Sequence, residues 1–123
     1  MPAPSLFILY VDNPPASTAF YVDLLGISPV ETSPTFAMFV LATGVKLGLW
    51  SRHTVEPPVD GIGTAGEIAF AVPSEEVVLQ THLSWKAKGL AILQAPVAMD
   101  FGHTFTALDP DGHRLRVYAP SAD

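Results

Sequence analysis

Glu67 and Arg116, two ionisable residues of opposite charge, are the first candidates for chemistry in this chain of 123 residues. Glu67 opens the apolar segment EIAFA, and Arg116 lies in the segment RLRVY. A carboxylate beside an arginine could act as a general base next to a group that stabilises an oxyanion. The same two residues could instead form a salt bridge between neighbouring strands. We expect the salt bridge, because paired charges in concave sites are frequently structural.

A second candidate group is aromatic and lies in two similar segments, GVKLGLW from Gly44 to Trp50 and GHRLRVY from Gly112 to Tyr118. Their glycines, a leucine and their final aromatic residues align, which indicates a repeated strand with Trp50 and Tyr118 in equivalent places. An indole can stack on a flat ligand, and the missing side chain at Gly48 would leave space beside the ring. Burial of Trp50 at a dimer interface is an equally good explanation, because aromatic residues are enriched at both kinds of site.

Successive side chains of a strand point to opposite sides, so the residues of the predicted strands are divided between two faces of a sheet. One face is apolar and suited to packing against helices, and it contains Phe7, Leu9, Val11, Val45, Leu47, Leu49, Ile68, Phe70, Val72, Leu115 and Val117. The other, which we call the open face, contains Leu6, Ile8, Tyr10, Lys46, Gly48, Trp50, Glu67, Ala69, Ala71, Arg114, Arg116 and Tyr118. Small residues leave room, aromatic residues stack and charges orient polar groups, so the open face is typical of a ligand site.

The elements that must position these faces recur twice along the chain. In the first half we predict a strand at Leu6–Val11 and a strand-like stretch from Pro29 to Trp50, within which Phe36–Leu41 and Val45–Trp50 form a hairpin. In the second half the predicted strands are Glu67–Val72, Leu90–Gln94 and Gly102–Leu108, with a further strand after the Asp-Pro-Asp-Gly turn at 109–112. With one helix in each half, the order is β-α-β-β-β twice. We therefore expect a single domain, 1–123, made of a first module at 5–50, a linker at 51–63 and a second module at 64–120.

Both helices have recognisable ends. Asn13 before two prolines and Ser74 before two glutamates predict N-caps, and Gly26 and Gly89 predict the C-terminal ends. The two apolar stripes that we expect to face the sheets are Ala16, Ala19, Phe20 and Leu24 in the first helix and Leu79, Leu83 and Ala87 in the second. Trp85 lies at the edge of the second stripe, and we expect it in the core.

Composition excludes several classes of function. The net charge is −6, with no concentrated basic surface, which argues against nucleic acid or an anionic membrane as a partner. Cysteine is absent, so disulfides and thiolate metal sites are excluded. The apolar run from Leu6 to Val11 is too short for a signal segment or a membrane span, and we expect a cytoplasmic protein. Because 49% of the residues are hydrophobic and only 15% are charged, we also expect a homodimer.

Three segments carry a resemblance to a known family: FYVDLLG after Asn13-Pro14, GEIAFAV at the start of the second half, and the closing DPDGHRLRVY. They resemble the vicinal oxygen chelate superfamily of glyoxalase, bleomycin-resistance and ring-cleaving dioxygenase proteins. The segments GLWSRHTVEP and DFGHTFTALDPDGHRLRVY are also similar to phenazine-antibiotic resistance proteins. The resemblance implies an α+β fold in which two βαβββ modules curve their mixed sheets around a cavity, and it implies a dimer.

The resemblance also implies where a metal ion would bind in the enzymes of the superfamily. The four ligand positions fall on Leu6, Gly48, Glu67 and Arg116, of which only Glu67 could bind a divalent ion. An arginine at such a site adds a positive charge that does not titrate away. We therefore expect no metal, no other cofactor and no catalytic residue. The resemblance further implies that the strand in DFGHTFTALDP borders the cavity, which adds Phe101, His103, Thr104 and Thr106 to the candidates.

These observations predict a protein that binds and sequesters a planar aromatic small molecule, with an antibiotic of bleomycin- or phenazine-resistance type as a candidate ligand. The predicted ligand-binding residues are Tyr10, Trp50, Glu67, Phe101, His103, Thr104, Thr106, Arg116 and Tyr118. The enzymatic alternative is a glyoxalase-like lyase or isomerase, or a dioxygenase, with a degenerate metal site built on Glu67. A third alternative is an interaction subunit whose cavity has lost its function.

Overall fold

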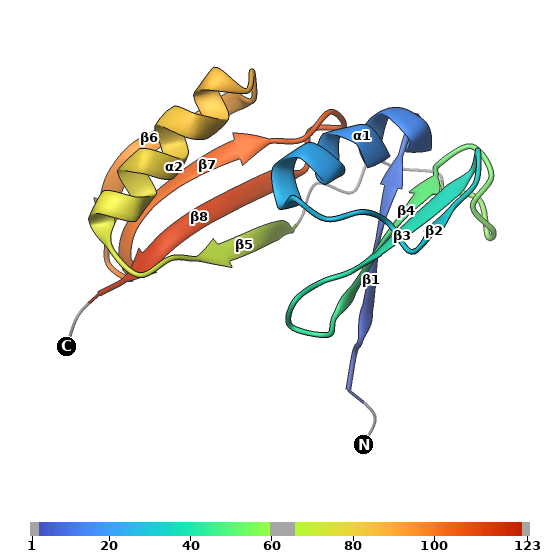
Figure 1. Ribbon diagram of the computed structural model, residues 1–123, viewed down its shortest axis with the longest axis horizontal. Helices are drawn as coiled ribbons and strands as arrows, with labels where there is room; N and C mark the ends of the chain where they lie inside the picture. The colour runs from blue at the N-terminus through green and yellow to red at the C-terminus, as the bar shows by residue number, and fades with distance from the viewer. Residues whose placement is uncertain (1–2, 60–65, 122–123) are drawn as a thin grey trace. The chain divides into compact units, whose positions relative to one another are not determined.

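The computed structural model describes residues 3–59 and 66–121 and contains two compact units, Met1–Ile62 and Gly63–Asp123 (Figure 1). Each unit has one helix and one four-stranded sheet, with the elements in the order β-α-β-β-β. The predicted α+β class and the two βαβββ modules are confirmed. Residues 60–63 of the predicted linker and the first two residues of the predicted second module lie outside the described residues.

The first unit consists of β1 (Leu6–Val11), α1 (Pro14–Leu25), β2 (Glu31–Thr32), β3 (Phe36–Val40) and β4 (Lys46–Ser51). Its sheet has the order β1-β4-β3-β2, with β1 parallel to β4 and the other pairs antiparallel. The parallel register places Tyr10 opposite Trp50 and Ile8 opposite Gly48. These four residues therefore share one face of the sheet, as the alternation predicts.

The second unit consists of β5 (Glu67–Ala71), α2 (Glu75–Ala87), β6 (Ala91–Met99), β7 (Gly102–Leu108) and β8 (Arg114–Pro120). Its sheet has the equivalent order β5-β8-β7-β6, and β5 is parallel to β8. The helix α2 crosses one face of this sheet and packs on β6, β7 and β8 (Figure 1). The strand β6 is longer than predicted and contains two register shifts, one on each side of Gln94.

The predicted helix ends are confirmed. The side chain of Asn13 accepts a hydrogen bond from the backbone N–H of Ala16, and the side chain of Ser74 accepts one from the N–H of Val77. These bonds satisfy donors that have no partner within the helix. Gly26, with φ 69°, caps the end of α1 in the left-handed region that favours glycine.

The helix faces that pack on the sheets differ from the predicted stripes. In α1 the buried residues are Pro14, Ser17 and Tyr21, and in α2 they are Val78 and Trp85. The predicted stripes lie beside these faces, and the side chains of Leu79 and Leu83 in α2 are 44% and 65% exposed. Apolar residues at helical spacing identify a stripe along a helix, but they do not show that this stripe faces the sheet. The helix can pack on the sheet through a neighbouring stripe, as both helices do here. The prediction of a core position for Trp85 is confirmed.

Two further predictions need correction in the first unit. Phe7, assigned to the packed face of β1, is 54% exposed. The linker was predicted to begin at residue 51, but Ser51 is the last residue of β4, and the N–H of Arg52 donates to the carbonyl of Val11. Val55 is only 3% exposed, so the segment at 52–55 packs as part of the first unit.

Candidate ligand-binding faces

Arg116 is the centre of a polar network on the open face of the second unit. Its Nε donates to Oε1 of Glu67 at 2.6 Å, and its Nη2 donates to Oε2 of the same carboxylate at 3.4 Å. The Arg116 side chain is 17% exposed and that of Glu67 is 33% exposed. The predicted salt bridge between these residues is confirmed. Its bidentate geometry fixes the plane of the guanidinium.

The other terminal nitrogen of Arg116 is held by uncharged groups. Nη1 donates to the side-chain oxygen of Gln94 at 3.2 Å and to the hydroxyl of Thr104 at 3.1 Å. Thr104 in turn donates to the carbonyl of Val117, and Thr106 donates to the same oxygen of Gln94. Both threonines are buried and are not themselves part of the exposed surface: Thr104 holds the guanidinium directly, and Thr106 holds it through Gln94.

Two aromatic rings border this network. The ring of Phe101 faces the guanidinium of Arg116, with the carbon Cζ 5.7 Å from the ring centroid, which is a cation–π contact. Tyr118 meets Phe101 edge-on, with the centroids 6.2 Å apart. Phe101 remains 41% exposed. The face therefore presents aromatic surface next to a fixed, hydrogen-bonded charge.

The register of β7 and β8 brings these side chains together. Thr106 lies opposite Arg116, and Thr104 lies opposite Tyr118. Phe101 reaches the same face because the chain turns at Gly102, which has φ 139°. A Cβ at Gly102 would lie 2.0 Å from the carbonyl oxygen of Ala119, so only glycine fits here.

His103 does not belong to this group, and its predicted place beside the other residues is wrong. Its Nε2 lies 3.4 Å from a carboxylate oxygen of Glu75, which is in the first turn of α2. His103 shares the parity of Phe105, whose ring contacts Trp85 of α2. Successive side chains on a strand point to opposite faces, so His103 lies on the helix side while Thr104 lies on the open side.

The open face of the first unit is aromatic and carries fewer polar groups. Trp50 lies opposite Tyr10 in the sheet and meets Phe36 edge-on, with centroids 6.3 Å apart. The space that Gly48 was expected to leave beside Trp50 is filled in part by Phe36, because a Cβ at Gly48 would lie 3.1 Å from Cζ of that ring. Tyr10 is 45% exposed, so aromatic surface remains accessible on this face.

The four residues at the expected metal positions do not fit a metal ion. Leu6 and Gly48 have no ligand atoms in their side chains. Arg116 directs its donors at both carboxylate oxygens of Glu67, and a divalent cation at that carboxylate would have to displace a guanidinium that stays charged. No chemical step through a metal follows from this arrangement.

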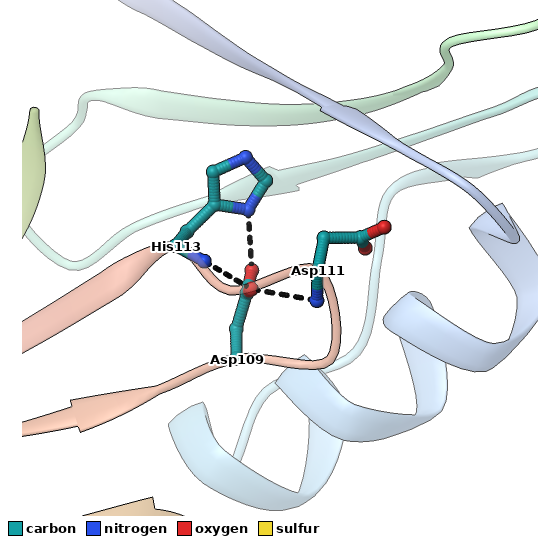
Figure 2. Close-up of side chains that lie close together, drawn as sticks. All are labelled: Asp109, Asp111 and His113. Atoms are coloured by element: carbon teal, nitrogen blue, oxygen red, sulfur yellow. Dashed lines mark hydrogen bonds and ion pairs between the residues drawn. The ribbon is translucent and has the colours of Figure 1, made fainter. Parts of the chain in front are cut away.

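A different cluster, Asp109, Asp111 and His113, offers three ligand atoms within 4.8 Å of one another, but its bonds explain it as a turn (Figure 2). One oxygen of Asp109 accepts from the backbone N–H groups of Asp111 and His113, at 2.9 and 2.8 Å. Its other oxygen lies 2.8 Å from Nδ1 of His113. The hydrogen bond to Asp109 raises the pKa of His113 above its ordinary value. The cluster orients the turn that leads into β8.

Gln94 and Phe36 contribute to the two faces and were not among the predicted site residues. No feature of the sequence near Gln94 distinguishes it from a solvent-exposed strand residue. Phe36 could have been found, because it occupies the partner position of Trp50 in the predicted hairpin of the first module. The nine predicted residues are thus divided: Tyr10 and Trp50 on the first unit, six on the open face of the second, and His103 on its helix side.

Comparison with known proteins agrees with this fold. The sequence profile of the Glyoxalase/Bleomycin resistance protein/Dioxygenase superfamily matches residues 5–117. The phenazine antibiotic resistance protein EhpR of Enterobacter agglomerans is 32% identical over 117 residues, which cover 93% of this chain and 89% of that protein. Within the described residues, no helix is long and apolar enough to cross a membrane.

Solved structures extend the comparison. A protein of Agrobacterium tumefaciens with a solution NMR structure is 61% identical, with a TM-score of 0.91 over 99% of this chain and 100% of the other. A glyoxalase-related enzyme of Fulvimarina pelagi has a TM-score of 0.82 at 21% identity, over 97% of this chain and 88% of that one. At that identity the likeness concerns the fold alone.

Proposed function

The chain belongs to the Glyoxalase/Bleomycin resistance protein/Dioxygenase superfamily, and from this membership and the two open faces we propose that it binds and sequesters a planar aromatic small molecule without a metal ion. The observation that carries the proposal is the guanidinium of Arg116, held by Glu67, Gln94 and Thr104 against the exposed ring of Phe101. Such a surface can stack on a flat ring system and orient one polar substituent.

The relative from Enterobacter agglomerans suggests the class of ligand. Its name describes resistance to a phenazine antibiotic, and a phenazine is a flat tricyclic aromatic compound. Binding without turnover lowers the free concentration of such a compound, which is a sufficient mechanism of resistance. We propose a phenazine-type compound as the ligand. Because both carboxylate oxygens of Glu67 accept hydrogen bonds from Arg116, we propose no metal-assisted reaction at this site.

Tryptophan fluorescence tests this proposal, because the chain has only two tryptophans. Titration with phenazine-1-carboxylate should quench the fluorescence saturably. Trp50→Phe should remove the quenching that is caused by ligand on the open face of the first unit. Phe101→Ala should weaken binding at the open face of the second unit, where its ring lies against Arg116, since stacking contributes about 0.5 to 1.5 kcal/mol beyond the buried area. Absence of a saturable response to any planar aromatic compound would refute the proposal.

Trp85 supplies the matched control. It is 7% exposed and lies on the helix side of the second sheet, with its ring centroid 5.4 Å from that of Phe70 and 5.5 Å from that of Phe105. Trp85→Phe should therefore retain the quenching that Trp50→Phe loses.

Elemental analysis of protein purified without chelator should find no stoichiometric nickel, zinc, iron or manganese. One equivalent of such a metal, lost on replacement of Glu67, would contradict metal-independent binding.

A further inference from the structure

We propose that Gln94 selects ligands at the open face of the second unit by donating its side-chain amide N–H to an oxygen acceptor on the aromatic ligand. This inference rests on the proposed function and narrows the ligand class to planar aromatics that carry a carbonyl or carboxylate substituent. It follows from the orientation of the amide, from the weak hydrogen-bond partner of its nitrogen among the described residues, and from the irregular register of β6.

The orientation of the Gln94 amide is set by its partners. Arginine has donors and no acceptor, so the atom of Gln94 that faces Nη1 of Arg116 at 3.2 Å must be the oxygen. The hydroxyl of Thr106 donates to the same oxygen at 3.1 Å. With two donors on Oε1, the NH₂ group of Gln94 is directed away from Arg116.

The NH₂ group has no strong acceptor among the described residues. Its contact is the thioether sulfur of Met99, at 3.8 Å. Thioether sulfur is a weak acceptor, so an oxygen atom would form a better bond with this nitrogen. Gln94 is half-buried and Met99 is 43% exposed, so the amide lies where a ligand could reach it. Gln94 thus offers a fixed donor with a weak partner, and it contacts the same guanidinium as the exposed ring of Phe101, so it is suited to bind an acceptor atom of a ligand.

The first of the two register shifts in β6 places this amide on the open face. Ile92 lies opposite Ala107, and a regular antiparallel strand would then place Gln94 opposite Phe105, whose ring lies on the helix side. The register shift between Ile92 and Gln94 instead pairs Gln94 with Thr106. β-Bulges often re-aim a side chain next to a binding site, and here one brings the amide to Arg116.

Two neutral probes of similar shape test the inference: methyl phenazine-1-carboxylate, which carries an exocyclic acceptor, and 1-propylphenazine, which does not. The wild-type protein should bind the ester about fivefold to tenfold more tightly, as one net hydrogen bond predicts. Gln94→Glu keeps an oxygen for Arg116 and Thr106 but replaces the donor with a second acceptor. This variant should lose or reverse the preference, while its urea midpoint stays at or above that of the wild type.

Met99→Leu is the matched control, because it removes the sulfur from Nε2 while keeping the volume of the side chain. It should retain the preference for the ester. Equal binding of the two probes by the wild type, or an unchanged preference in Gln94→Glu, would overturn the role of Gln94 and leave the proposed function standing. Failure of both probes to bind would refute the proposed function as well.

Discussion

The ion pair between Glu67 and Arg116 makes a quantitative prediction about stability. Its charges are close, with 2.6 Å between Nε and Oε1, but its burial is incomplete, with 17% of the Arg116 side chain and 33% of the Glu67 side chain exposed. Methionine at either position removes one charge and keeps much of the side-chain volume. The variants Glu67→Met, Arg116→Met and the double variant form a thermodynamic cycle that isolates the interaction.

Each single replacement should lower the free energy of unfolding by about 2 to 3 kcal/mol. Breaking a fully buried pair costs about 3 to 5 kcal/mol because the remaining charge stays desolvated. Water can reach the exposed third of Glu67, which reduces that penalty. Arg116→Met also removes the hydrogen bonds to Gln94 and Thr104, so it should be the more damaging change. The double variant leaves no unpaired charge and should recover about 1 to 2 kcal/mol of the summed losses.

Urea unfolding followed by circular dichroism measures all four proteins. The coupling free energy is the difference between the loss in the double variant and the sum of the two single losses. A coupling below about 0.5 kcal/mol is the additivity expected of distant, independent sites. That result would show that the pair does not interact in solution, and the account of the site as a network centred on Arg116 would be wrong.

Three further predictions concern other features. Gly102→Ala should destabilise the protein by on the order of 3 kcal/mol in urea unfolding, because its Cβ would clash with the carbonyl of Ala119; a loss below about 1 kcal/mol would contradict the positive-φ turn. Since Asp109 raises the pKa of His113, the pair stabilises the fold fully below the unfolded pKa of about 6.5, and this contribution is lost as pH rises through the folded value. Wild type should therefore lose its stability advantage over His113→Gln as pH rises above about 6.5, and a constant difference would exclude the linkage. We also propose a homodimer, because the edge strand β1 exposes large apolar side chains such as Phe7, which is 54% exposed. Light scattering should give about twice the monomer mass of 13.1 kDa, and a monomer peak at micromolar concentration would refute the proposed dimer.

Local chemistry made much of the fold predictable. The side chains of Asn13 and Ser74 cap the helices that follow them, and the left-handed residue Gly26 ends α1, because each acts within a few residues of its own position. The salt bridge of Glu67 with Arg116 was also predictable, although the residues are far apart in sequence. Each occupies a strand of clear alternation, and the internal repeat indicates that these two strands are neighbours.

Local sequence patterns are enough to predict both helices, the order of the elements and the face to which each regular strand directs its charged and aromatic residues. Three features depend instead on packing across the sheet: which stripe of α2 is buried, the position of Phe36 over Gly48, and the contact of Gln94 with Arg116. Alternation assigns faces only while the register is regular: the first register shift in β6 reverses the face of Gln94, and the second shift, between Gln94 and Val97, restores the original alternation. Such a shift is stabilised by contacts between strands, so no local pattern around Gln94 could reveal it.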